Sequence, residues 1–285
     1  MVEAAQIAEG RLVPFEVFNG GCAVSNFIRQ HRTWQRDLVE CMKFLLPAGA
    51  AFADVGAHIG YFTAAMAQQV GPAGRGLAVE PDAESRELLE RNLARLGLSD
   101  RVAVEAVAAG AAPSRGVLRV DRANRGASAL IAEAGGGGGA PVEVVPLPDL
   151  LYRAGLADRR PLLVKIDVQG AERAVLEGLE GFLARTSRRP YLLVEIAPAA
   201  WAADGGHQWL AAFIERHGYD VHLFCASTGR RPVPPRLSPA TFAGLLDDIL
   251  RYSESSREID ILLLPGGLWR RFIDFYGEKP GIEAT

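Results

Sequence analysis

The sequence lacks a long apolar run, and this absence excludes a membrane-spanning helix. No uninterrupted apolar stretch approaches the roughly 18 residues that such a helix needs. Residues 1–6 also lack the basic segment followed by an apolar segment that marks a secretory signal. We therefore expect a cytoplasmic protein that makes no contact with a membrane.

The sequence is also poor in cysteine and in net charge. Its three cysteines, Cys22, Cys41 and Cys225, form no C-x-x-C pair and are odd in number, which favours reduced thiols over a disulfide framework. The formal net charge of −3 gives no general attraction for a polyanion. We expect neither a nucleic-acid partner nor cysteine ligands to a metal.

Two nucleotide-binding fingerprints are missing as well. The region around Gly56 and Gly60 does not have the G-x-G-x-x-G spacing of a pyrophosphate loop, because His58 and Tyr61 occupy two of its positions. No Gly-Lys-Ser/Thr follows, so the region is not a P-loop either. A nicotinamide-dependent reductase is therefore disfavoured.

One stretch that is present, Phe52 to Thr63, is typical of a strand, a tight turn and the start of a helix. An apolar run includes Asp54, and Gly56 and Gly60 follow it. Glycine lets the backbone turn sharply and approach a ligand because no Cβ obstructs it. Asp54 would lie at the carboxyl end of the strand, where open parallel sheets bind ligands, and a carboxylate suits a cationic amine better than a phosphate.

A second short strand also ends in an acid. Gly76 to Val79 is apolar and is followed by Glu80, twenty residues after Gly60. This is the position that hydrogen-bonds ribose hydroxyl groups in doubly wound folds. The glycine turn and the acid together predict a ligand that contains adenosine.

The order of the expected elements predicts an α/β fold. Strands are expected at residues 52–55, 76–80, 102–107, 162–167, 192–197, 219–224 and 259–264, and helices at 32–46, 61–70, 83–96, 171–185 and 209–217. This alternation is typical of a Rossmann-like, doubly wound, mostly parallel sheet, here of seven strands. A chain of 285 residues is long enough for one such domain with additions.

Additions are expected at both sides of the first strand. Residues 1–46 form an N-terminal extension and helix that act as a lid or support. Within it, residues 1–30 alternate weakly, before Gly20-Gly21 and again from Ala23 to Phe27, which favours a short hairpin broken at the two glycines or a lid over the site. Residues 47–285 then make up the main domain. Within it, residues 108–147 predict a β-flap.

The flap is expected to contain two extra strands, at 116–121 and 141–147, with Ser128 near the mouth of the site. Five consecutive glycines, 135–139, carry maximal backbone entropy and should be mobile. A second insertion, 226–257, is expected on the substrate side. The amphipathic tail 269–276 could cover a sheet edge or contact a second subunit in a homodimer.

Three ordered blocks resemble the FkbM-type family of S-adenosylmethionine-dependent methyltransferases. They are residues 54–63, 79–82 and 165–172, and the resemblance extends over residues 34–225. Two positions depart from the family pattern. Gln169 stands where the family often has Glu, and Leu147-Pro148-Asp149 stands where it has Leu-Asp-Asp.

The resemblance implies a class I methyltransferase fold, S-adenosylmethionine as the cofactor, and methylation of a hydroxyl group on a small, glycosidic or natural-product-type acceptor. Two alternatives stay open: methylation at nitrogen, and a module that binds an adenosine ligand without turnover. The residues expected to bind the donor are Asp54, Gly56, Ala57, His58, Gly60, Tyr61, Thr63, Glu80, Pro81, Asp82 and Val107.

Three residues are candidates for the chemical step. Asp167, at the carboxyl end of the fourth strand, is the best-placed general base for a hydroxyl proton, with a helix cap or a donor contact as alternatives. Glu172 either acts in the site or complements the dipole of its own helix. His222, on an apolar strand, is the reserve base.

Two further charges have near-identical surroundings in the fourth and fifth strands. If those strands pair in the register that their patterns suggest, Lys165 and Glu195 lie side by side and form a buried ion pair. Asp167, Glu172 and Glu195 could also hold Mg²⁺. No adjacent Asp-Asn pair completes such a site at the end of the fifth strand, so we expect metal-free transfer.

Overall fold

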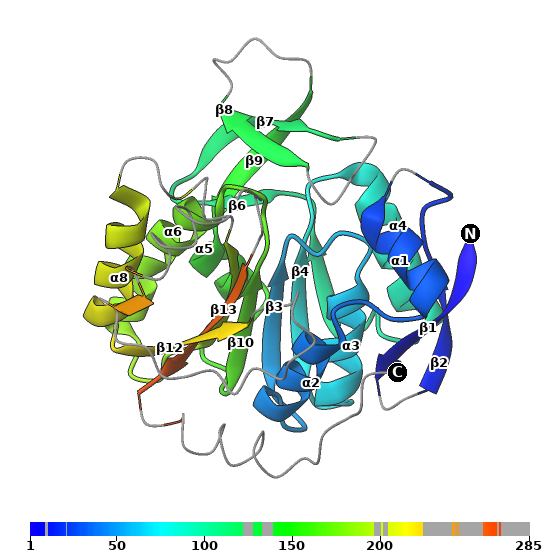
Figure 1. Ribbon diagram of the computed structural model, residues 1–285, viewed down its shortest axis with the longest axis horizontal. Helices are drawn as coiled ribbons and strands as arrows, with labels where there is room; N and C mark the ends of the chain where they lie inside the picture. Colours follow the sequence, from blue (N-terminus) through cyan, green and yellow to red (C-terminus); the bar gives the residue numbers. More distant parts are fainter. Residues whose placement is uncertain are drawn as a thin grey trace.

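The computed structural model describes residues 1–8, 11–20, 22–121, 128–132, 139–196, 201, 205–224, 241–242, 244, 259–266 and 268. Within them lie a central sheet with helices on both faces, a smaller sheet beyond one of its ends, and an N-terminal hairpin at its side (Figure 1). None of the helices in these ranges is long and apolar enough to cross a membrane.

The central sheet has seven strands. They are β3 (Ala51–Val55), β4 (Arg75–Val79), β5 (Val102–Glu105), β10 (Leu162–Ile166), β11 (Tyr191–Ile196), β12 (Tyr219–Phe224) and β13 (Ile259–Pro265). Their order across the sheet is β12-β13-β11-β10-β3-β4-β5. In this sheet β13 alone runs opposite to the other six strands. The expected Rossmann-like, mostly parallel sheet of seven strands is confirmed.

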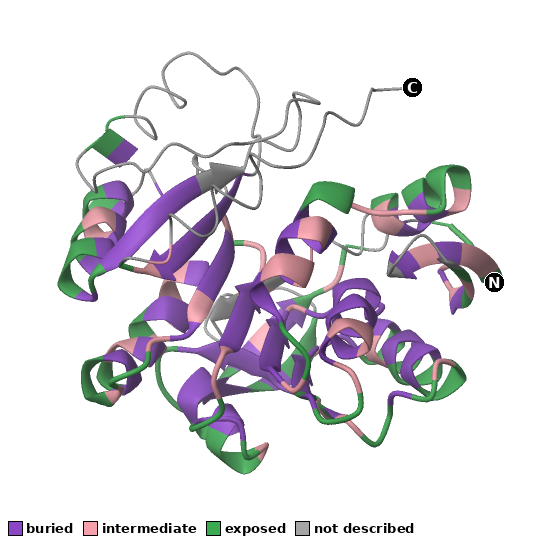
Figure 2. Cartoon of the chain, turned by 90° about the horizontal axis from the view of Figure 1, so that it is seen from below, coloured by how far each residue is buried: buried purple, intermediate pink, exposed green. Residues whose placement is uncertain are grey.

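Side-chain alternation along the strands divides the core between two helical layers. Ala51, Ala53 and Val55 of β3 belong to one apolar cluster and Phe52 to the other, because successive strand residues point to opposite faces. One layer contains α5 (Leu147–Arg153), α6 (Glu172–Arg185) and α8 (Gly206–Arg216), and the other contains α2 (Arg36–Leu45), α3 (Tyr61–Val70) and α4 (Ala83–Arg95). Figure 2 shows the strands buried and the outer turns of the helices exposed.

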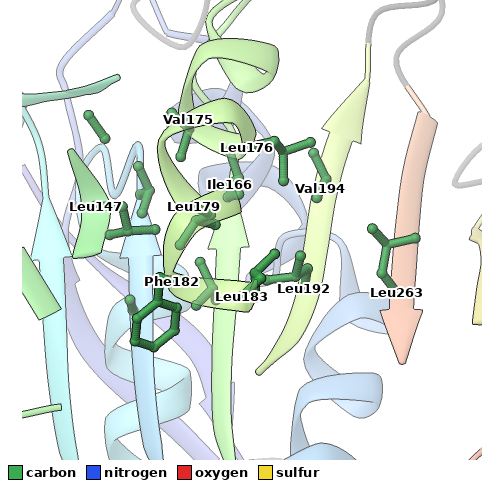
Figure 3. Packing of buried hydrophobic residues seen from close by; sticks show 14 of the residues in the cluster. Leu147, Ile166, Val175, Leu176, Leu179, Phe182, Leu183, Leu192, Val194 and Leu263 are labelled. Carbon is green, nitrogen blue, oxygen red and sulfur yellow. The ribbon is translucent and has the colours of Figure 1, made fainter. Parts of the chain in front are cut away.

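Helix α6 illustrates how the helices are held on the sheet. Its apolar residues recur every three or four positions and pack on β10 and β11 (Figure 3). The helix contributes Val175, Leu176, Leu179, Phe182 and Leu183 to this contact. Each such side chain is almost fully buried and stabilises the fold by about 1.5–3 kcal/mol relative to an exposed position. The helix that carries Glu172 is therefore firmly fixed.

The N-terminal extension contains a hairpin, but not where the glycines suggested. Strands β1 (Val2–Ala8) and β2 (Arg11–Glu16) pair antiparallel, and α1 (Ala23–His31) follows. The expected strand-like pattern after Gly21 is thus helical. Cys22 caps this helix, because its Sγ accepts a hydrogen bond from Ser25 N at 3.4 Å. The expected helix 32–46 begins later, at Arg36.

The hairpin is tied to the main domain by one buried amide. The Asn92 side chain of α4 accepts a hydrogen bond from Glu16 N at 2.6 Å and donates to Glu16 O and Ile59 O, both at 3.0 Å. The Tyr61 hydroxyl also donates to Gln6 O at 2.7 Å. Because Ile59 and Tyr61 lie on either side of Gly60, the extension supports the glycine turn directly.

The small sheet has four strands, and the expectation of two extra strands was therefore too low. They are β6 (Ala108–Gly110), β7 (Ser114–Arg119), β8 (Ala129–Ala132) and β9 (Ala140–Pro146), in the order β6-β9-β7-β8. Helix α5 follows directly and was not expected. Most of the glycine run, the insertion 226–257 apart from residues 241–242 and 244, and the tail 269–276 lie outside the described residues.

Candidate functional site

A cavity of about 240 Å³ lies at the carboxyl edge of the central sheet. Its walls come from the turn after β3, the end of β4, the segment after β10, the small sheet and the N-terminal extension. This is the edge at which open parallel sheets bind ligands. Seven of the eleven residues expected to bind the donor line it: Gly56, Ala57, His58, Tyr61, Glu80, Pro81 and Val107.

The two glycines of the turn are required by the packing of the protein itself. Gly56 has φ +83°, and a Cβ there would lie 1.7 Å from the carbonyl oxygen of Asp167. Gly60 has φ +82°, and its Cβ would come within 2.9 Å of the Leu89 side chain. Gly60 does not line the cavity, so its expected contact with the donor becomes a packing role against α4.

Glu80 holds the turn in place and faces the cavity. Its Oε2 accepts a hydrogen bond from His58 N at 2.7 Å, and its Oε1 accepts one from Asp82 N at 2.8 Å. Burial raises the pKa of Glu80 to about 7, although the two backbone donors oppose the shift. Each carboxylate oxygen can accept a second hydrogen bond. Glu80 therefore suits a ligand with neighbouring hydroxyl groups.

His58 lines the cavity with a left-handed backbone, at φ +49°. Its ring lies 5.9 Å from the Phe18 ring, and its Nε2 lies 3.7 Å from Cys22 Sγ. The residue at the N-cap of α3 is Gly60, so His58 does not cap that helix. The N-terminal extension thus packs directly on the turn.

Three other expected donor residues lie behind the cavity wall. Asp54 is 1% exposed, and its Oδ2 accepts a hydrogen bond from Thr63 Oγ1 at 2.5 Å. Burial raises the pKa of Asp54, partly offset by Lys165 and Thr63. Asp82 caps α4 by accepting hydrogen bonds from Ser85. None of Asp54, Thr63 and Asp82 lines the cavity, so their contribution is to hold the turn and the helix.

Lys165 and Glu195 do not form the expected ion pair. In the observed register Lys165 lies opposite Leu193 of β11, two residues before Glu195. The Lys165 ammonium instead bonds Asp167 Oδ2 at 2.8 Å. Gln169 Nε2 then donates to Asp167 Oδ1 at 3.0 Å and to Glu195 Oε2 at 2.8 Å. Lys165, Asp167, Gln169 and Glu195 all line the cavity; we call them the polar cluster.

The charges of the polar cluster are strongly coupled. Burial alone would lower the pKa of Lys165, but the carboxylates of Asp167, Asp54 and Glu195 raise it. Burial alone would raise the pKa of Asp167, but Lys165 and the hydrogen bonds around it hold it below the ordinary value. Burial and the neighbouring Asp167 raise the pKa of Glu195. Lys165 and Asp167 therefore stabilise each other's charged form, whereas the charge of Asp167 disfavours a second carboxylate at Glu195.

Exposure distinguishes the two partners of the ion pair. The Asp167 side chain is 25% exposed, whereas that of Lys165 is 3% exposed and lies 4.8 Å from the centre of the Phe62 ring. Asp167 is thus the charged group of this pair that a molecule in the cavity can reach. Its role as a base or a ligand contact stays a prediction.

Two expected catalytic residues are not brought to the cavity. Glu172 is 3% exposed, and its Oε1 accepts hydrogen bonds from Gly170 N at 2.9 Å and Val168 N at 3.3 Å. It therefore holds the start of its own helix. His222 is fully buried on β12, which β13 and β11 separate from β10. A catalytic role for either residue is not supported by this geometry.

The structure also brings residues to the cavity that the sequence did not single out. Trp34 and Gln35 come from the N-terminal extension, and Leu118 and Leu130 come from the small sheet. Ser128 lines the cavity as expected. Gln169 also lines the cavity, and its departure from the family pattern was the feature of the sequence that could have identified it as a residue of the site. Among the described residues, no group of three or more His, Cys, Asp or Glu side chains could hold a metal ion.

These features define a class of protein. A mostly parallel seven-stranded sheet with a single antiparallel strand beside its edge strand, and a glycine turn at the carboxyl edge, form the class I methyltransferase fold. A model of the methyltransferase FkbM domain matches residues 54–221. The match covers more than half of the chain, which therefore belongs to the FkbM methyltransferase family. Methyl transfer is the activity that this family match supports.

The individual proteins that this chain resembles share less than a third of its residues. Methyltransferase sdnD of Sordaria araneosa is 29% identical over 206 residues, which are 62% of this chain and 76% of that protein. A putative rRNA methylase from Clostridium thermocellum is 10% identical, with a TM-score of 0.46 over 80% of this chain and 93% of that one. The O-methyltransferase TomG from Streptomyces achromogenes is 13% identical, with a TM-score of 0.44 over 88% of this chain and 92% of that one.

Proposed function

We propose that the protein is an S-adenosylmethionine-dependent O-methyltransferase that acts on a hydroxyl group of a small-molecule acceptor. One observation carries the proposal: a single cavity is lined both by the turn with Glu80 and by the polar cluster with its reachable Asp167. The first provides contacts for an adenosine-containing donor. The second provides a group that accepts a proton.

The residues at the first part of the cavity fit the donor. Glu80 has acceptor capacity left for a ribose diol after binding two backbone amides. Val79, Pro81 and Val107 give apolar walls beside it, which suit the faces of an adenine ring. When bound, S-adenosylmethionine supplies a methyl group carried on a positively charged sulfur. The protein has to hold this donor and align the acceptor oxygen with it.

In this proposal Asp167 acts as the general base. A hydroxyl group is almost un-ionised at neutral pH, so its proton has to leave as the new bond forms. The Asp167 carboxylate lines the cavity, and Lys165 and Gln169 fix both of its oxygens. A fixed carboxylate is a better-positioned acceptor than a mobile one, because less reorganisation is needed at the moment of transfer.

Methylation at nitrogen is a second candidate, and the Lys165–Asp167 ion pair favours it. The ion pair lowers the pKa of Asp167, with burial opposing, and so makes it a weaker base. A neutral amine already has a free electron pair and needs no base before it attacks. The chemical identity of the methylated product separates the two candidates.

Calorimetry tests donor use. S-adenosylhomocysteine should bind the wild-type protein, whereas NAD and ATP should not bind comparably. Glu80→Gln should weaken the binding about tenfold, because one ribose contact loses its charge. Glu84→Gln, which changes a carboxylate on the exposed surface of α4, is the matched control and should leave it unchanged. Tight NAD binding without a response to S-adenosylhomocysteine would refute the proposal.

Kinetics test the role of Asp167. With an acceptor that the wild-type protein methylates, Asp167→Asn should lower kcat by about 10²–10⁴. Its affinity for S-adenosylhomocysteine should stay within about threefold, because the amide keeps the shape of the carboxylate. A near-normal kcat would refute the base role and favour nitrogen as the acceptor atom. A weakened donor affinity with normal kcat would make Asp167 a donor contact instead.

A further inference from the structure

Besides the turn, Glu80 and the polar cluster, the cavity is lined mostly by apolar side chains. Trp34 and Val24 come from the N-terminal extension, Leu118 from β7 and Leu130 from β8. The Trp34 ring is braced by Phe27, whose ring lies 5.3 Å away, edge-on at 81°. A held indole ring offers a flat surface to a ligand, and such surfaces favour another flat ring.

Other than the turn, Tyr61 and Glu80, the polar side chains that line the cavity are Gln35, Ser128 and the four of the polar cluster, which already bind one another. Lys165 and Gln169 donate to Asp167, and Gln169 also donates to Glu195. An acceptor with many hydroxyl groups would leave most of them without partners against Val24, Leu118 and Leu130. Burying a polar group without a partner costs about 1–3 kcal/mol. The cavity therefore disfavours a sugar-like acceptor.

The strength of the base also separates two kinds of hydroxyl group. An ordinary aspartate has a pKa of about 3.9, and a phenol has one of about 10. Burial raises the pKa of Asp167, but Lys165 and its hydrogen bonds bring it below that ordinary value. The proton transfer from a phenol is thus uphill by somewhat more than about 6 pKa units. From an alcohol, whose acidity is close to that of water at 15.7, it is uphill by about 12.

We propose that the acceptor is a phenol-type aromatic hydroxyl, with its ring against Trp34, Val24 and Leu118 and its oxygen at the Lys165–Asp167 pair. This inference rests on the proposed O-methyltransferase function and names its substrate class. The acceptor O–H bond breaks and its proton passes to the Asp167 carboxylate. The acceptor oxygen forms a bond to the methyl carbon, whose bond to sulfur breaks with the electron pair left on sulfur. The products are an aryl methyl ether and neutral S-adenosylhomocysteine.

Two probes of equal carbon skeleton test the inference by binding. With the protein saturated by S-adenosylhomocysteine, calorimetry compares 2-naphthol with decahydro-2-naphthol, which has the same rings without aromaticity. The aromatic probe should bind about 3- to 10-fold more tightly, the factor that aromatic contact adds beyond buried area. Trp34→Ala should abolish this preference. Tyr152→Ala removes an exposed aromatic ring outside the cavity and should retain it.

Turnover provides the second readout. With a deuterated methyl donor, 2-naphthol should gain the label at least about 100-fold faster than decahydro-2-naphthol, because the weak base discriminates by acidity. Equal or tighter binding of the saturated alcohol, binding of neither probe, or faster labelling of the saturated alcohol or of methyl glucoside overturns the phenol assignment. These results leave the proposed function standing if S-adenosylhomocysteine binds. Failure of S-adenosylhomocysteine to bind refutes the proposed function as well.

Discussion

Replacing Lys165 by methionine should destabilise the protein strongly, and by an amount that depends on pH. The Lys165 side chain is 3% exposed and lies 2.8 Å from Asp167, with Asp54 and Glu195 nearby. Methionine fills a similar volume but leaves the Asp167 carboxylate without its counter-ion. Breaking a fully buried pair in this way costs about 3–5 kcal/mol, and because the Asp167 side chain is 25% exposed, the lower end of that range applies here. We expect a loss of this size in the free energy of unfolding at pH 8.

The sign of the pH dependence follows from the two pKa shifts. In the wild-type protein the lowered pKa of Asp167 contributes stability above about pH 4, and the raised pKa of Lys165 contributes it below about pH 10. Both contributions are complete between pH 5 and pH 9. Without Lys165, burial raises the pKa of Asp167, so the variant loses stability as the pH rises. The difference between variant and wild type should grow from pH 5 to pH 8.

Urea unfolding followed by circular dichroism at pH 5 and pH 8 measures both effects. Lys43→Met is the matched control, because Lys43 bonds Glu40 at 2.7 Å on a partly exposed helix surface. Such a surface pair contributes about 0–1 kcal/mol. If Lys165→Met costs no more than this control, or if its cost is the same at both pH values, then the polar cluster is not the coupled buried group that we describe.

Three further predictions concern the cavity. Burial raises the pKa of Glu80 to about 7, so the wild-type protein should lose on the order of 2–3 kcal/mol of unfolding free energy as Glu80 ionises between pH 5 and pH 8. In Glu80→Gln this pH-dependent loss should be absent when urea unfolding is measured at both pH values. Gly56→Ala should cost at least about 3 kcal/mol in unfolding free energy, because its Cβ would overlap the Asp167 carbonyl, whereas Gly97→Ala, with φ +66° and open space, should cost about 1–2 kcal/mol. EDTA should leave the wild-type methylation rate unchanged; a rate abolished by EDTA and restored by Mg²⁺ would show that a metal takes part.

Local patterns predicted the elements of the central sheet well. Helix α3 (Tyr61–Val70) and strand β12 (Tyr219–Phe224) have the bounds that the sequence predicted. In α3 a glycine turn marks the start, and in β12 the apolar or aromatic residues Tyr219, Val221 and Leu223 alternate with polar ones after Gly218. Such signals lie within a few residues of one another, so they need no knowledge of the rest of the fold.

The pairing of Lys165 could not be predicted in the same way. The segments Leu162–Ile166 and Leu192–Ile196 carry the same alternation, and a shift of two residues keeps every side chain on its face. The pattern therefore cannot distinguish a partner at Glu195 from one at Asp167. The segment Ala23–His31 failed for another reason: a short apolar run fits a strand or a helix until its contacts are known.

The candidate catalytic residues show a similar limit. Glu172 and Asp167 are both acids after the same strand; the sequence favours Asp167 as the base because it lies nearer the end of the strand, but it leaves a role in the site open for Glu172. The structure separates them because Glu172 accepts hydrogen bonds from two backbone amides behind the cavity, whereas Asp167 opens into it. The position of His222 depends on the order of the strands in the sheet. In that order β13 and β11 lie between β12, which carries His222, and β10.

The position of β13 has a consequence for how the chain folds during synthesis. This strand lies between β11 and β12, but residues 225–258 separate it from β12 in the sequence. A growing chain thus exposes the edge of β11 and the whole of β12 before the strand that joins them leaves the ribosome, at about 5–20 residues per second. Unpaired apolar edges are templates for wrong pairing. Among the described strands, β13 is thus the last to emerge and the one that closes the sheet, and β12 has no partner in the sheet until β13 arrives.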